Sequence, residues 1–183
     1  MITTATSLDL FAARVRDGWG PLTSDLAAAC RAHLADLLRA PAEEPWLASL
    51  LAGEDASREL YRDPVHGFVL LAHHEPHALY RPPHDHGRGW VIYGVQQGEM
   101  EMSTYARVTD PDGSVHLVKR DTSLLRAGDV RVYLPGDIHD TRCVAGPALQ
   151  FRFTERDLRH EDQVEHRITR YAERGGRWVP AST

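Results

Sequence analysis

The chain has 183 residues, of which 42% are hydrophobic and 26% are charged, and it carries a formal net charge of −5. This length suits one domain with an appended lobe, and the composition supports a packed core and excludes an intrinsically disordered chain. Because the charges are spread along the sequence without a basic stripe, we expect no nucleic-acid partner.

The cellular compartment is indicated by the first residues and by the cysteines. Asp9, Arg14 and Arg16 lie where a signal peptide would need an apolar run. No stretch approaches the roughly 18 uncharged residues of a membrane span. Cys30 and Cys143 are too few for a disulfide framework and favour a reducing compartment. We therefore expect a soluble, cytoplasmic protein that has no membrane partner.

Three helices are predicted in the first third of the chain, where apolar residues recur at helical spacing. Residues 7–18 begin with Ser7 as the candidate N-cap. Residues 23–40 form a second helix with one apolar side. Residues 43–53 form a shorter third helix, with Pro45 near its start.

Short strands between turn signals are predicted in the middle of the chain. They cover residues 67–75, 89–98, 99–108, 114–120, 129–136, 139–144 and 148–155, a spacing typical of an all-β barrel or sandwich. The highly charged tail is predicted as loop and extended structure. We therefore divide the chain into a helical lobe that packs on the barrel (1–57), a β-barrel with the functional site (58–156) and a C-terminal extension (157–183).

Two histidines lie two residues apart in the segment RPPHDHGRGW, residues 81–90. In a strand, residues i and i+2 point to the same face, so His84 and His86 can aim both imidazoles at one point inside a barrel. The segment GDVRVYLPGDIHD supplies a third imidazole, because its turns place His139 at the start of the next strand. These three histidines are the predicted metal ligands.

The two segments resemble the motifs of the cupin superfamily. In the first cupin motif, H-x-H is followed by a Glu and then by a Gly. Here His84, His86 and Gly98 match that motif, and Val91 occupies the Glu position. The resemblance implies a double-stranded β-helix barrel, a jelly roll, with N-terminal α-helices added to it.

The second cupin motif is a Gly followed by Pro, Gly and His. It is matched by Gly128, Pro135, Gly136 and His139. The resemblance extends from near residue 60 to near residue 155. Two motifs at the expected separation are a more specific signal than a lone H-x-H.

Three histidines without a carboxylate are neutral ligands that leave the double charge of an ion uncompensated. Such a site should accept an anionic substrate ligand directly. Imidazole suits several ions, and we expect Fe²⁺, with Zn²⁺, Ni²⁺ and Mn²⁺ as alternatives. Open positions on the metal would permit O₂ chemistry at iron or water activation at zinc.

The order of LYRDPVHGFVLLAHHEP and PPHDHGRGW is similar to that of thiol dioxygenases of the cysteine dioxygenase type. That resemblance implies an iron site which oxidises a thiol to a sulfinate with O₂. It assigns the iron ligands to His84, His86 and His139, and it assigns the binding of the substrate carboxylate to Arg62. A guanidinium pairs bidentately with a carboxylate, so the role suits an arginine.

Two features of these enzymes are absent. Some of them carry a cross-linked Cys at the position of Val91, and their Ser-x-His-x-Tyr row is replaced here by Ala148, Gln150 and Arg152. Arg152 would place a second cation near the metal, unless it is solvated outside the barrel. Tyr93 would line the cavity, unless it belongs to the core. The expected substrate is therefore a small thiol or another small anion.

The predicted activity is a dioxygenase reaction between an anionic small molecule and O₂, carried out by a monomer or a homodimer. Two alternatives stay open: a zinc or iron Lewis-acid lyase or hydrolase on the same histidines, and a non-catalytic cupin that binds a small ligand. The adjacent His73 and His74 point to opposite faces of a strand, so at most one of them reaches the interior.

Overall fold

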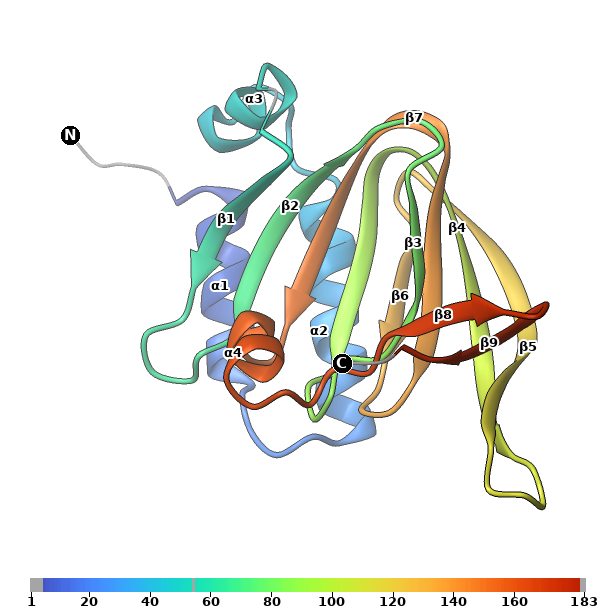
Figure 1. Ribbon diagram of the computed structural model, residues 1–183. Coiled ribbons are helices and arrows are strands. Elements are labelled where there is room, and N and C mark those ends of the chain that lie inside the picture. Colours follow the sequence, from blue (N-terminus) through green and yellow to red (C-terminus); the bar gives the residue numbers. More distant parts are fainter. Residues whose placement is uncertain (1–4, 54, 182–183) are drawn as a thin grey trace.

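The structure, a computed structural model, describes residues 5–53 and 55–181, and within these ranges it contains four helices and one sheet of nine strands (Figure 1). The helices are α1 (Ser7–Asp17), α2 (Ser24–Leu37), α3 (Pro45–Leu51) and α4 (Leu158–Gln163). The strands are β1 (Ser57–Arg62), β2 (Val69–Glu75), β3 (Tyr80–His84), β4 (Val91–Thr109), β5 (Val115–Arg126), β6 (Val130–Tyr133), β7 (Ile138–Thr154), β8 (Tyr171–Arg174) and β9 (Arg177–Pro180). No helix in the described ranges is long and apolar enough to cross a membrane.

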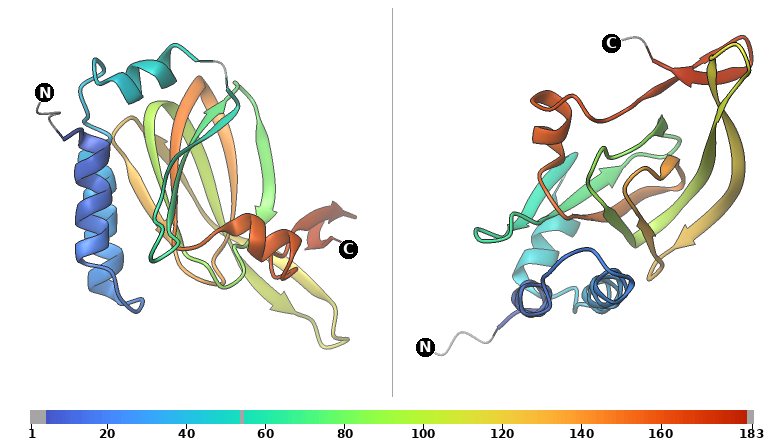
Figure 2. Two further views of the ribbon diagram at one scale, coloured as in Figure 1. Left: turned by 90° about the vertical axis from the view of Figure 1, so that its left-hand side faces the viewer. Right: turned by 90° about the horizontal axis from the view of Figure 1, so that it is seen from below.

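The strands form one curled antiparallel sheet. Its order is β1-β2-β7-β4-β5-β9-β8, and in addition β3 pairs with β7 and β6 pairs with β4. The long strands β4 and β7 pair with each other and also with different neighbours at their two ends, so the sheet folds over on itself. The predicted mainly β fold class is confirmed, and Figure 2 shows the curled sheet from two further sides.

β4 is a single strand where the sequence predicted two. Its pairing register with β7 shifts around Gly98, whose φ is 81°. A Cβ at this position would lie 2.6 Å from the carbonyl oxygen of Ala145, so the glycine permits a bulge that bends the strand without ending it. The predicted strands 139–144 and 148–155 are likewise continuous in β7.

α1 is capped by Thr6 and not by Ser7 as predicted. The Thr6 side chain accepts from the backbone N–H of Asp9, and the Asp9 carboxylate accepts from the backbone N–H of Thr6, which completes a capping box. Ser7 is engaged elsewhere, because its backbone N–H and its hydroxyl both donate to Glu44. This contact ties the start of α1 to the residue before α3.

α1 and α2 lie side by side against one outer face of the curled sheet (Figure 2). Their apolar sides share a core cluster with the sheet that includes Phe11, Leu34, Phe68 and Phe153. Each of these side chains is at most 2% exposed, and burial of such a side chain contributes about 1.5–3 kcal/mol. The helices therefore cover one face of β2 and β7, and the other face of these strands is free to line the interior.

The C-terminal residues contain a helix, α4, where the sequence predicted only loop and extended structure. Asp157 caps it by accepting from the backbone N–H of Arg159, and Leu158 is buried against the barrel. Glu161 on α4 is also buried and pairs with Arg156 and Arg167. The local sequence pattern did not predict this helix, because Arg156 and Arg167, which pair with Glu161, lie outside the helix itself. The predicted extended part is present as the β8–β9 hairpin.

Candidate metal centre

The three predicted metal ligands come together at one end of the barrel interior. His84 is the last residue of β3 and lies directly opposite His139 of β7 in the strand register. One ligand nitrogen from each of His84, His86 and His139 lies within 4.8 Å of those of the other two. The ring centroids are 4.8 to 5.2 Å apart. The three histidines come from two strands and one loop.

His86 reaches the cluster by a different route from the predicted one. β3 ends at His84, so strand alternation does not position both rings; His86 lies in the loop that follows. Asp85 holds this loop in place. Its carboxylate accepts from the backbone N–H groups of Gly87 and Thr169, and its own backbone N–H donates to the carbonyl oxygen of Thr169.

The nitrogen atoms of the cluster have the state that a metal ligand needs. Burial is the largest cause that lowers the pKa of all three histidines, so each ring stays neutral and keeps a lone pair. The Nδ1 of His84 lies 2.8 Å from the carbonyl oxygen of Pro82, which makes Nδ1 the protonated nitrogen and leaves Nε2 free.

The other two rings have buried nitrogens that lack a hydrogen-bond partner within the described residues. These are Nδ1 of His86 and both nitrogens of His139. An unsatisfied buried polar atom costs about 1–3 kcal/mol, and a bound metal ion would satisfy one nitrogen of each ring. The donor set therefore fits a first-row divalent metal.

Val91, which stands where the first sequence motif of cupins has a Glu, is fully buried on β4. The ligand set is therefore three neutral imidazoles. Two tyrosines complete the surroundings: the hydroxyl of Tyr93 lies 3.3 Å from Nε2 of His86, and the ring of Tyr133 stacks on His139. Tyr133 was missed by the sequence analysis, although it lies inside the second motif, between Gly128 and Pro135.

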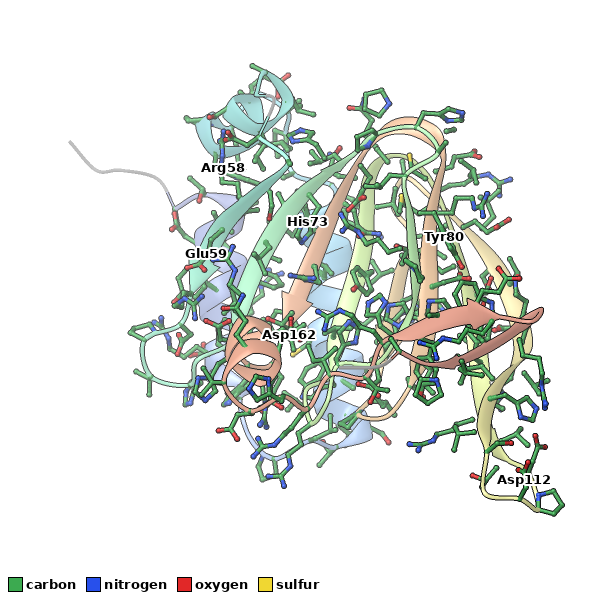
Figure 3. The ribbon with its side chains drawn as sticks, in the orientation of Figure 1. Arg58, Glu59, His73, Tyr80, Asp112 and Asp162 are labelled. Atoms are coloured by element: carbon green, nitrogen blue, oxygen red, sulfur yellow. The ribbon has the colours of Figure 1, made fainter. Side chains whose placement is uncertain are left out.

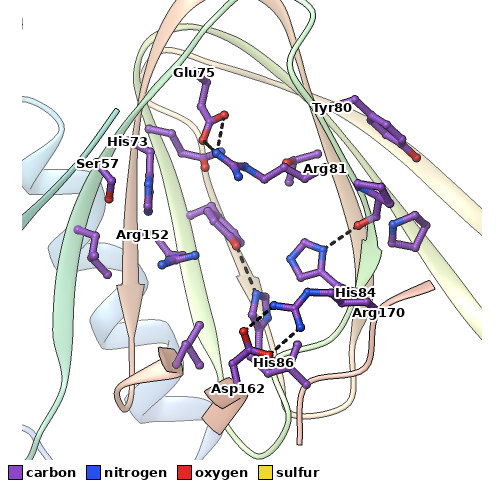
Figure 4. Close-up of a pocket in the computed structure, with 18 of the residues that line it drawn as sticks. Ser57, His73, Glu75, Tyr80, Arg81, His84, His86, Arg152, Asp162 and Arg170 are labelled. Atoms are coloured by element: carbon purple, nitrogen blue, oxygen red, sulfur yellow. Dashed lines mark hydrogen bonds and ion pairs between the residues drawn. The ribbon is translucent and has the colours of Figure 1, made fainter. Parts of the chain in front are cut away.

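A cavity of about 790 Å³ begins at the histidines and continues along the interior (Figure 4). Arg152 lines it. On β7, Phe151 and Phe153 pack into the core shared with the helices, so the side chain of Arg152 between them points to the opposite face. In the strand register Arg152 lies beside Tyr93 of β4. Tyr93 is 4% exposed and also lines the cavity, so it belongs both to the core and to the cavity wall.

Arg152 is the predicted cation that the structure brings to the histidines. Within the described residues its side chain forms no ion pair, and its Nε is buried without a hydrogen-bond partner. Its positive charge contributes to the lowered pKa of each of the three histidines. The guanidinium therefore has its charge and at least one donor available for a ligand.

Arg62, the other predicted carboxylate-binding residue, lies elsewhere. Its guanidinium donates to Glu59 on the same strand and to Asp157 before α4, at 2.7 to 3.0 Å. It lines a smaller pocket of about 90 Å³, which adjoins the cavity of the histidines and shares Arg152 with it, but Arg62 does not line that cavity itself. The Arg62 guanidinium is therefore paired with two carboxylates and does not line the cavity of the histidines.

Two ion pairs that the sequence analysis missed also line the cavity. Arg81 of β3 donates to the buried Glu75 of β2, and Arg170 pairs with Asp162 of α4 at 2.6 Å (Figure 4). His73 is the member of the His73–His74 pair that lines the cavity. His73 and Asp162 both lie over the interior, whereas Asp112 lies at the distant tip of the β4–β5 hairpin (Figure 3).

No protein-family model and no curated protein matches this sequence. Among solved structures, the chain is similar to KdgF from Halomonas sp., at 17% identity and a TM-score of 0.42, over 54% of this chain and 74% of that one. It is similar to the cupin domain of Cnp3 from Schizosaccharomyces pombe, at 13% identity and a TM-score of 0.44, over 63% and 77% of the two chains. A further likeness is to oxalate oxidase, at 18% identity and a TM-score of 0.39, over 56% and 52%.

Proposed function

We propose that the protein is a metal-dependent cupin oxygenase, a non-haem iron(II) dioxygenase that oxidises a small thiol or another small anion with O₂. One observation carries the proposal. Three neutral imidazoles converge at the end of a cavity whose wall holds the guanidinium of Arg152, which has no carboxylate partner within the described residues. A metal site with no anionic protein ligand, beside a free cation, suits an anionic substrate.

In this proposal His84, His86 and His139 hold the iron, which supplies the redox chemistry with O₂ when it is bound. The reaction with a thiol is R–SH + O₂ → R–SO₂H, in which sulfur gains both oxygen atoms and O₂ is the oxidant. The protein places the sulfur beside the histidines.

Two further side chains orient the substrate. Arg152 binds the acidic group through charge-assisted hydrogen bonds, which are about twice as strong as neutral ones. Burial raises the pKa of Tyr93, so its hydroxyl remains protonated and can donate to an anion beside His86. Both side chains extend from neighbouring strands of one rigid sheet.

A second candidate function uses the same three histidines to hold zinc as a Lewis acid in a lyase or hydrolase. The buried Val91 at the Glu position favours the zinc function as much as the iron function. In both cases the three neutral ligands leave the charge of the ion available to polarise a substrate. Consumption of O₂ separates the two functions.

The test is to load the purified protein with iron(II) under argon, admit air, and measure O₂ uptake and sulfinate with a panel of small thiols. We expect uptake with at least one thiol, one sulfinate per O₂, and none with protein loaded with zinc. The His139→Ala variant is the control for metal bound elsewhere. Full iron occupancy without O₂ uptake for any thiol or small acid would contradict the proposal.

A further inference from the structure

The cavity is larger than a small thiol requires. It measures about 790 Å³, within the range of about 300–1,000 Å³ that is usual for sites of larger organic ligands. From the histidines it extends past Arg152 to the Glu75–Arg81 ion pair (Figure 4). A ligand that reaches both ends would meet polar side chains along the whole path.

The middle of this path carries two buried polar groups without partners. Gln150 of β7 and His73 of β2 lie directly opposite each other in the strand register. Within the described residues, the Nε2 of Gln150 and the Nε2 of His73 are both buried without a hydrogen-bond partner. Gln150 is only 3% exposed. Buried donors without partners are rare in folded proteins and call for an acceptor at this place.

His73 is neutral at physiological pH. Burial, together with the charges of Arg152 and Arg81, lowers its pKa to about 3. A neutral imidazole can donate one N–H to an acceptor without adding a charge. Arg152, which forms no ion pair within the described residues, supplies the positive charge of this region.

Arg81 completes the group at the outer end. Its side chain is half-exposed, and a single guanidinium nitrogen donates to both oxygens of Glu75, at 2.9 and 3.1 Å. The buried Glu75 thereby neutralises the charge of Arg81 and fixes its direction across the cavity (Figure 4). The side chain of Arg81 makes no other hydrogen bond within the described residues, so other donors of its guanidinium remain free.

We propose that Gln150, His73 and Arg81 form a second anion-binding subsite, and that the substrate is a two-ended anion. One end binds at the histidines, and a carboxylate at the other end accepts from this subsite. The buried groups left without partners there are the amide nitrogen of Gln150 and the neutral imidazole of His73, which can donate one N–H, and Arg152 lies between the two ends. The assignment of the first end rests on the proposed function, whereas the subsite itself rests on the unpartnered donors.

The subsite can be tested by binding alone, without turnover. The probes are straight-chain dicarboxylates from succinate to suberate, each compared with the monocarboxylate of the same chain length. Isothermal titration calorimetry would measure their affinities for the protein loaded with iron(II) under argon. At one chain length we expect the dicarboxylate to bind at least tenfold more tightly than its monocarboxylate.

Two variants then locate the second carboxylate. Gln150→Met keeps the length of the side chain and removes its donor. Glu75→Gln combined with Arg81→Gln removes the guanidinium donors without leaving a buried anion unpaired. Each should abolish the advantage of the dicarboxylate and leave the affinity of the monocarboxylate within threefold. Gln97→Met changes the same residue type at an exposed position of β4 and is the matched control.

Equal affinities within every pair, or an advantage that survives in both variants, would overturn the second subsite. So would the absence of measurable binding by every dicarboxylate. These outcomes are independent of O₂ uptake, which tests the proposed oxygenase reaction. A protein that binds dicarboxylates as expected but consumes no O₂ would keep the subsite and lose the oxygenase.

Discussion

The ring of Tyr133 lies over the imidazole of His139, with the two centroids 3.9 Å apart and the planes inclined at 29°. Tyr133 is 2% exposed, and its hydroxyl donates to the sulfur of Met102. Neither nitrogen of His139 has a hydrogen-bond partner within the described residues. The stack therefore orients this ring in place of the hydrogen bond that usually positions a metal-binding histidine.

Replacement of Tyr133 by leucine should weaken metal binding by about 10–100-fold, the usual effect of the loss of a group that orients a ligand. Tyr133→Phe keeps the ring and should stay within about threefold of the wild type. Competition with a chromogenic chelator measures both affinities. An unchanged affinity in Tyr133→Leu would show that the stack does not orient His139.

His86→Ala should abolish stoichiometric metal retention, because two neutral imidazoles cannot replace three. Elemental analysis of the purified variant measures the metal content. His74→Ala is the matched control, since His74 lies beside the carbonyl oxygen of Asp55 and outside the cavity lining. If His86→Ala retained as much metal as His74→Ala, the metal would be bound at another place.

Arg152→Gln should weaken the binding of an anionic substrate by about 10–100-fold and leave the metal content unchanged, because charge-assisted hydrogen bonds contribute about 1.5–3 kcal/mol. Arg62→Gln should change that affinity by less than about threefold, since its ion pairs lie on partly exposed side chains and contribute about 1 kcal/mol or less. Titration of both variants with the same substrate compares the two arginines. A larger effect at Arg62 would return the carboxylate-binding role to that residue.

Asp63 should make the stability of the protein depend on acid. Burial would raise the pKa of this carboxyl, but hydrogen bonds from the backbone N–H of His66 and from Arg16 lower it to about 2. Because the folded-state pKa lies below the unfolded value, the ionised Asp63 stabilises the fold above about pH 4, and this contribution is lost as the pH falls toward 2.

Asp63→Asn should therefore cost about 1–3 kcal/mol at pH 7, and it should flatten the loss of stability between about pH 4 and pH 2. Urea denaturation at a series of pH values measures both effects. An acid transition of unchanged steepness would show that other carboxylates control it.

Much of the site could be predicted from local sequence patterns. The H-x-H segment and the PGDIH segment identify His84, His86 and His139, and alternation along β7 places Arg152 on the face opposite Phe151 and Phe153. The path of His86 could not be predicted, because its loop is held by Asp85 and Thr169, which are far apart in the sequence.

The roles of the arginines depend on long-range contacts. Arg62 has a plausible place in the sequence pattern, but Asp157, 95 residues away, binds its guanidinium. Arg81 lies three residues before His84 and was not singled out, because its partner Glu75 becomes important only when β2 and β3 face each other across the cavity. No sequence motif indicates which arginine lacks a carboxylate partner in the folded protein.

The sequence by itself determined the β-rich fold class, the three histidines and the alternation of β7, because these depend on spacings of a few residues that backbone geometry converts directly into faces. The tertiary structure alone decided that Arg62 is neutralised, that Arg152 faces the histidines unpaired, and that His73 and Gln150 lie opposite each other without partners. The physical reason is that an ion pair or an unsatisfied donor depends on which strands become neighbours in space. The periodic spacing of residues along one strand does not determine that order of strands.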